Sequence, residues 1–211
     1  MPGPNPNKIY PNEKIKQIVY IKNVITRPNI IVGDYTYYDD INGAEKFEEH
    51  VTHHYEFLGD KLIIGKFCAI AKGIEFIMNG ANHRMKSVST YPFNIMGGGW
   101  EKFTPNLDDL PLKGDTVVGN DVWFGQNVTV MPGIHIGDGA IIAANSVVAK
   151  DIPPYCVAGG NPCRVIRQRF DNELISYLIN LKWWDWNEDK IFRNMEALCS
   201  GDLTKIKSIT D

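Results

Sequence analysis

Bulky apolar residues recur at every sixth position along the second half of the chain. From residue 118 the sequence reads VGNDVW, FGQNVT, VMPGIH, IGDGAI, IAANSV and VAKDIP. The apolar residues that lead these hexads are Val118, Phe124, Val130, Ile136, Ile142 and Val148. A second small or apolar residue follows each of them four places later, and a period of six fits neither a helix nor one long alternating strand. It predicts short strands separated by tight corners and stacked as coils of a parallel β-helix, in which each coil buries its apolar side chains against its neighbours.

The first half of the chain carries the same pattern less regularly. Hexads begin at Ile64 and Ile70, and VGDYTY at Val32 resembles an isolated earlier one. Between these hexads and the long run, residues 76–114 are rich in glycine, proline, asparagine and aromatic residues. An interruption of this length inside a compact domain is usually functional or disordered. We therefore predict an all-β solenoid that is interrupted by an extended loop.

From Arg169 onward the sequence becomes helical in character. Asp171 can cap a helix, and an apolar stripe follows it at helical spacing. The stripe consists of Leu174, Tyr177, Leu178 and Leu181. The nearby tryptophans at 183, 184 and 186 could stack on a ligand, but we expect them to anchor the terminal helix, since that is the commoner role of such a cluster. The sequence thus predicts a β-helix domain over 1–168, which includes an irregular N-terminal segment and the loop, and a helical tail over 169–211.

Composition narrows the class of function. With 22 basic and 25 acidic residues the net charge is −3, which favours neither nucleic acid nor an anionic membrane as a partner. No apolar stretch approaches the roughly 20 residues that span a bilayer, and the proline-rich polar start does not resemble a secretory signal. The four cysteines form no C-x-x-C pair. We therefore expect a cytoplasmic protein with reduced thiols.

Several motifs in and around the predicted loop resemble one family. They are M-N-G-A-N-H-R-M at 78–85, S-T-Y-P-F-N at 89–94, G-G-G-W-E-K at 97–102, K-G-D-T-V-V-G-N-D-V-W-F-G at 113–125 and G-G-N-P at 159–162. Together they resemble the xenobiotic acetyltransferases of the hexapeptide superfamily, and most of all the streptogramin A O-acetyltransferases. The resemblance implies a left-handed β-helix and transfer of an acetyl group from acetyl-CoA to a hydroxyl of a streptogramin A antibiotic. It implies no bound cofactor and no metal.

The resemblance assigns the role of general base to His83, one of only five histidines. A hydroxyl attacks a thioester poorly unless a base removes its proton, and histidine, with an unperturbed pKa of about 6.5, can do so near neutral pH. Direct attack is expected, since no Ser-His-Asp or Cys-His arrangement for an acyl-enzyme is evident. The alternative is a loop histidine that only hydrogen-bonds the neighbouring chain.

Further site residues are implied by the same resemblance. Those expected to bind acetyl-CoA are Trp123, Gly125, Ala143, Ala144, Lys150 and Arg167. Small residues would leave backbone groups open to the pantetheine arm, and the two basic residues would meet its phosphates. Tyr37 and Tyr55 are expected to contact the acceptor, although ordinary aromatic packing explains them equally well. The family also implies a homotrimer with active sites between subunits.

Three other functions remain open from the sequence alone. A chloramphenicol acetyltransferase of the same family would share the loop histidine and the hexads. A silent scaffold would need neither the loop histidine nor the small-residue groove. A metal enzyme could use the histidines at 50, 53 and 54, but adjacent strand residues point to opposite faces, so we expect His53 and His54 to diverge.

Overall fold

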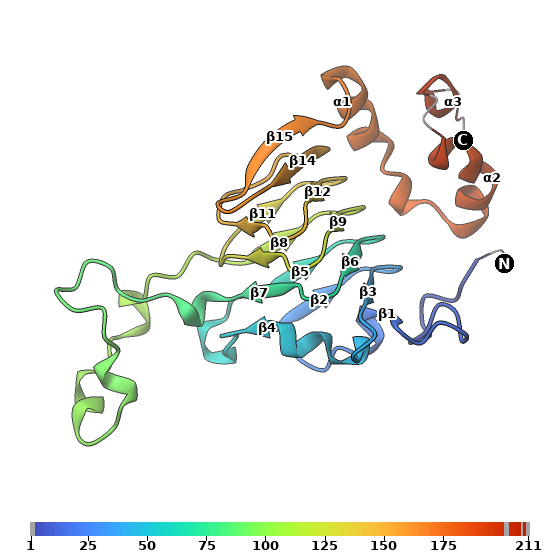
Figure 1. Cartoon of the computed structure of the whole chain (residues 1–211). Helices are drawn as coiled ribbons and strands as arrows, with labels where there is room; N and C mark the ends of the chain where they lie inside the picture. Colours follow the sequence, from blue (N-terminus) through green and yellow to red (C-terminus); the bar gives the residue numbers. More distant parts are fainter. Residues whose placement is uncertain (1–2, 201–202, 208, 210–211) are drawn as a thin grey trace.

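The computed structural model describes residues 3–200, 203–207 and 209. Parts of the two predicted domains, at 1–2 and at 201–202, 208 and 210–211, lie outside the described residues. Short strands are stacked in coils, with the inserted loop projecting on one side and the helical tail lying on the other (Figure 1). The strands of successive coils pair in parallel. This confirms the predicted left-handed parallel β-helix with a loop insertion and a helical tail.

Three sheets form the sides of the solenoid. The wide sheet has the order β1 (Ile18–Tyr20), β3 (Tyr37–Asp39), β6 (Ala69–Ala71), β9 (Trp123–Phe124), β12 (Ile141–Ile142), β14 (Cys156–Gly159) and β15 (Arg164–Gln168). The first narrow sheet contains β13 (Val147–Val148), β10 (Thr129–Val130), β7 (Glu75–Ile77) and β4 (Val51–Thr52). The second narrow sheet contains β11 (His135–Ile136), β8 (Thr116–Val118), β5 (Leu62–Ile64) and β2 (Ile30–Val32). Each coil runs from the second narrow sheet through the wide sheet to the first narrow sheet.

The hexad pattern accounts for the core. All six leading residues from Val118 to Val148 are buried, and so are the residues four places after each of them. Val118 pairs with Ile136, three hexads further along the chain, so one coil takes one hexad per side. The small or glycine positions that follow the leading residues form the close contacts between stacked coils. The predicted isolated hexad at Val32 also belongs to a coil, since β2 and β3 pair in parallel with β5 and β6.

Antiparallel strands cover both ends of the wide sheet. β1 pairs antiparallel with β3 of the first complete coil. At the other end, β15 turns back on β14 in an antiparallel pair. The wide sheet is thus capped at each end by an antiparallel strand.

The inserted loop leaves after β7 and returns at β8, so Phe76 and Ile77 belong to the coil rather than to the loop. This junction lies at the corner between the two narrow sheets, which we call the loop edge. Four short 3₁₀ turns, at Asn79–Ala81, Phe93–Ile95, Trp100–Phe103 and Leu107–Asp109, are the regular structure within it. In Figure 1 the loop extends well away from the stacked coils.

The tail contains α1 (Asn172–Leu181), α2 (Glu188–Cys199) and α3 (Leu203–Lys207). The Asp171 side chain accepts a hydrogen bond from the Leu174 amide, as predicted for the helix start. Trp184 is buried in a second apolar cluster with Leu174 and Leu178, which confirms the anchoring role expected for the tryptophan run. No helix in the described part of the chain is long and apolar enough to cross a bilayer.

Candidate active site

His83 lies exposed on the inserted loop, and one of its ring nitrogens is already engaged. Its Nδ1 is 2.7 Å from the carbonyl oxygen of Thr90. A carbonyl can only accept, so in the neutral ring Nδ1 carries the hydrogen and donates it. The lone pair then resides on Nε2, which is the nitrogen that could accept a proton. This contact supplies what the sequence could not, namely the tautomer of the ring and the group that orients it.

The base of the loop is closed by one buried amide that sequence reasoning missed. Asn79 is 2% exposed, and its side chain bonds residues at both ends of the loop and Asp60 of the neighbouring coil. Asn79 belongs to the motif at residues 78–85, four residues before His83. A polar stretch that contains glycine does not indicate that its asparagine is buried. A glycine follows it: a Cβ on Gly80 would lie 2.4 Å from both the His53 carbonyl oxygen and the Tyr55 ring.

A row of outward-facing residues crosses the wide sheet. The cross-strand register runs from Tyr37 to Ala69, Trp123, Ile141, Val157 and Arg167. Tyr37 is half-buried, whereas Trp123 is 54% exposed and Arg167 is exposed. The structure therefore brings the predicted acceptor residue Tyr37 and two predicted acetyl-CoA residues onto one face, with Tyr37 toward the first coils.

Small residues lie beside this row, where the wide sheet turns toward the first narrow sheet. A Cβ on Gly125 would lie 2.6 Å from the Ala144 amide nitrogen, and one on Gly159 would lie 2.9 Å from the Ala143 Cβ. Larger side chains on the two glycines would therefore displace the next coil. This strip holds the predicted residues Gly125 and Ala143, which are partly buried, and Ala144, which is exposed.

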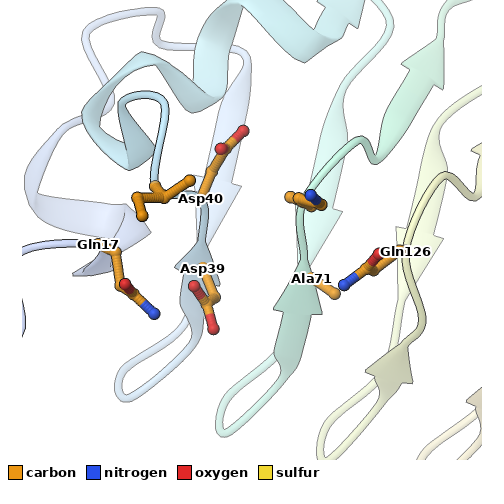
Figure 2. Close-up of a pocket in the computed structure, with 7 residues that line it drawn as sticks. Gln17, Asp39, Asp40, Ala71 and Gln126 are labelled. Carbon is orange, nitrogen blue, oxygen red and sulfur yellow. The ribbon is translucent and has the colours of Figure 1, made fainter.

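A polar cavity of about 290 Å³ opens at the foot of the strip (Figure 2). Its lining consists of Gln17, Asp39, Asp40, Ile41, Ala71, Lys72 and Gln126. Figure 2 shows Gln17 and Asp39 on one side of the opening and Ala71 and Gln126 on the other. Asp40 accepts hydrogen bonds from the Tyr38 hydroxyl (3.1 Å) and the Asn42 amide (2.8 Å). The cavity was not foreseen, because its residues come from three coils and from the chain before β1.

The remaining predicted residues lie on the loop edge rather than on the wide sheet. Tyr55 is exposed beside the base of the loop and stacks on Phe57, with ring centroids 5.8 Å apart. Lys150 lies between β13 and Ile152, and Ile152 bridges to Ile136 of β11. Lys150 therefore occupies the same corner two coils further along the solenoid. Within one chain, the predicted residues therefore form two separate groups. The loop edge carries His83, Tyr55 and Lys150, whereas the wide sheet carries Tyr37, Trp123 and Arg167.

The histidines at 50, 53 and 54 have separate surroundings. His50 Nε2 is 3.1 Å from the Tyr38 hydroxyl, whereas the buried His54 Nε2 is 2.9 Å from the Asp60 carbonyl oxygen. His53 is exposed and adopts a positive φ of 53°. Among the residues that the structure describes, no group of three or more histidine, cysteine or acidic side chains could hold a metal ion.

Comparison with known proteins identifies the family of the chain. The family model described as bacterial transferase hexapeptide (six repeats) matches residues 115–150. A probable macrolide acetyltransferase of Lysinibacillus sphaericus is 62% identical over 162 residues, which cover 77% of this chain and 90% of that protein. The virginiamycin A acetyltransferase of Staphylococcus aureus is 52% identical over 205 residues, covering 97% of this chain and 93% of the relative. A chloramphenicol acetyltransferase of Agrobacterium fabrum is 40% identical over 184 residues, covering 86% and 88% respectively.

Proposed function

The chain belongs to the hexapeptide-repeat acetyltransferases, the family of these relatives, and on that premise we propose that it acetylates a hydroxyl of streptogramin A antibiotics with acetyl-CoA as donor. The product would be an inactivated antibiotic. The observation that carries the proposal is the 52% identity over nearly the whole chain to the virginiamycin A acetyltransferase, against 40% for the chloramphenicol relative. The acceptor candidate Tyr37 lies close to the polar cavity, because Asp39 of the same strand lines it.

The contact between His83 and Thr90 supports the following chemistry. As the acceptor oxygen attacks the thioester carbonyl, Nε2 takes the hydroxyl proton and a tetrahedral intermediate forms. The C–S bond then breaks, the ester is released, and Nε2 returns the proton to the CoA thiolate. The Thr90 carbonyl, 2.7 Å from Nδ1, stabilises the imidazolium that exists between the two steps. A positioned base of this kind contributes about 10²–10⁴-fold in rate.

The separation of the loop edge from the wide sheet supports an active site between subunits. Copies arranged around a threefold axis along the solenoid would set the loop of one subunit against the wide sheet of the next. His83 would then face the acetyl end of a CoA that lies along the strip of Gly125, Ala143 and Ala144. Trp123 would flank the thioester. Arg167 and Lys150 would reach the CoA phosphates. We therefore propose a homotrimer with three equivalent sites.

A cytoplasmic location is part of the same proposal. All four cysteines are unpaired, and three of them are buried. Such thiols persist in a reducing compartment, where acetyl-CoA is also at hand.

The substrate is tested by release of free thiol from acetyl-CoA with virginiamycin M or chloramphenicol as acceptor. We expect turnover with virginiamycin M and a loss of at least 100-fold in kcat for His83→Ala. His135→Ala, which removes another exposed histidine from β11, serves as the matched control and should keep wild-type activity. Turnover with chloramphenicol alone would overturn the acceptor but not the mechanism, and a fully active His83→Ala would overturn the base.

The shared site is tested by mixing two inactive variants. Ala143→Trp fills the groove of its own subunit, whereas His83→Ala removes the base from its own loop. After subunits are exchanged at equal ratio, about one quarter of the interfaces should combine an intact loop with an intact groove and recover activity. Silence of the exchanged mixture, with exchange verified by mass, would show that each site uses one chain only.

A further inference from the structure

We infer that Asn79 is the positioning residue of the catalytic loop, which it fixes to the solenoid so that His83 is presented in one orientation. The inference rests on the proposed function, because it assigns no chemistry to Asn79 itself. Its basis is the set of hydrogen bonds that the Asn79 side chain makes at the base of the loop.

The Asn79 side chain uses its entire hydrogen-bonding capacity. Its Nδ2 donates to Asp60 Oδ2 at 2.8 Å and to the Gly114 carbonyl at 2.7 Å. Its Oδ1 accepts from the Lys113 amide at 2.7 Å and from Asn82 Nδ2 at 3.2 Å. A carboxamide has two donor hydrogens and two acceptor lone pairs. Asparagine is therefore matched to the site, whereas aspartate would lack the donors and leucine all four bonds.

These bonds join the two ends of the loop. Asn79 follows the exit from β7, whereas Lys113 and Gly114 precede the return at β8. The side chain of Asn82, the residue before His83, is held by Asn79 and also donates to the Pro111 carbonyl at 3.2 Å. These hydrogen bonds hold both ends of the loop and so fix the direction in which it leaves the solenoid. A catalytic base on a long loop can be positioned only if the base of that loop is held in place.

Asp60 anchors this amide to the neighbouring coil. Its Oδ2 accepts from the backbone amide of Asn79 at 3.0 Å as well as from the side chain, and Asp60 is only 5% exposed. The Asp60 carbonyl in turn meets His54 Nε2 at 2.9 Å. Buried polar groups of this kind stay fixed, because loss of one partner leaves another unsatisfied at a cost of about 1–3 kcal/mol. The base of the loop is therefore tied to the neighbouring coil.

The expected consequence is a loss of rate rather than of donor binding. A displacement of about 1 Å between base and reacting atoms costs about 10²-fold, while the acetyl-CoA strip lies on the wide sheet, away from Asn79. Asn79→Ala should thus lower kcat by about 10–100-fold and leave the KM for acetyl-CoA within twofold of wild type. If Asn79 only stabilised the fold, Asn79→Ala would lower the amount of folded enzyme, and the folded enzyme would keep its kcat.

The experiment measures kcat, both KM values, melting temperature and oligomeric mass for five proteins. They are wild type, His83→Ala, Asn79→Ala, the exchanged pair Asp60→Asn with Asn79→Asp, and Ile136→Ala. The exchanged pair restores the hydrogen bond between residues 60 and 79 with donor and acceptor reversed. Its kcat should therefore lie between that of Asn79→Ala and that of wild type. Ile136→Ala destabilises the core in a coil that does not carry the loop, and its folded fraction should keep its kcat.

The outcomes separate the two proposals. An inactive wild type would overturn the proposed function. An active wild type with an inactive His83→Ala, combined with an Asn79→Ala variant that keeps its kcat below its melting temperature, would overturn only the positioning role. An equal loss of kcat in Ile136→Ala, or a rise in the acetyl-CoA KM alone for Asn79→Ala, would do the same.

Discussion

The fold disfavours the ionised form of the Asp121 carboxyl, so its replacement by asparagine should stabilise the protein at neutral pH. It occupies the corner between β8 and β9 with a φ of 55°. Burial raises its pKa to about 6, and the neighbouring Asp138 adds to the rise, whereas the Arg169 guanidinium, 3.9 Å away, partly opposes it. Arg169 is also held by the Gly139 carbonyl at 2.6 Å, so it would keep its place in Asp121→Asn.

The sign of the effect follows from linkage. The pKa of Asp121 in the folded protein lies above its reference value of 3.8, so the native state binds the proton more tightly. The contribution of the protonated carboxyl to the free energy of unfolding is fully present below pH 3.8 and is lost as pH rises through about 6. The full difference corresponds to about 3 kcal/mol. Since 33% of the side chain is exposed, solvent screening reduces this to about 1–2 kcal/mol.

The assay is urea denaturation of wild type and Asp121→Asn at pH 7.5 and pH 4, at one fixed protomer concentration. At pH 7.5 the variant should be more stable by about 1–2 kcal/mol, and at pH 4 most of this advantage should vanish. Asparagine also tolerates a positive φ better than most residues, but that gain is the same at both pH values. An advantage that does not change with pH, or a loss of stability at pH 7.5, would refute the reasoning.

Three further predictions concern the groove, the cavity and the tail. Gly125→Ala should lower the unfolding free energy by about 1–3 kcal/mol and raise the KM for acetyl-CoA in steady-state assays, since its Cβ would lie 2.6 Å from the Ala144 amide nitrogen; an unchanged KM would remove this strip from the donor site. Asp39→Asn should raise the KM for the streptogramin about 3–10-fold, because a hydrogen bond contributes about 0.5–1.5 kcal/mol net, with the KM for acetyl-CoA unchanged; equal changes in both would argue against an acceptor role for the cavity. Asp171→Ala should cost about 1 kcal/mol in urea denaturation through loss of its cap on the Leu174 amide, whereas Asp171→Asn should cost little; equal losses would mean that the cap does not stabilise the tail.

Much of the fold could be predicted because one physical requirement acts on every hexad. A side chain that leads a hexad has to face the interior, so Val118, Phe124 and the later leading residues form an unbroken apolar series. The same requirement acts on α1, where Asp171 marks the start and the leucines mark the buried face. The predicted start of the loop at residue 76 was wrong by two residues, because Phe76 and Ile77 of β7 still continue the coil pattern before the chain departs.

The site could be predicted less completely, because its polar contacts connect residues that are distant in sequence. Nothing in the motif around His83 indicates that the Thr90 carbonyl fixes its ring, or that Asn79 is buried against Asp60. Such bonds have no period and depend on where the chain returns to the solenoid. The polar cavity has the same character, since Gln17 and Gln126 meet there only because of the stacking of the coils.

The hexad repeat also hides which side of the solenoid a residue occupies, and this decides how the site can form. Each hexad looks alike in sequence, yet successive hexads lie on different sheets. The insertion breaks this equivalence, because it leaves β7 and returns at β8 and so marks the loop edge. The row of Trp123 then falls on the wide sheet, one corner away from the origin of the loop. The loop that carries His83 projects outward from this edge, away from the stacked coils, as Figure 1 shows. The proposed chemistry would therefore use a second copy of the chain, and the three-sided shape of a coil makes cyclic association the simplest way to supply one.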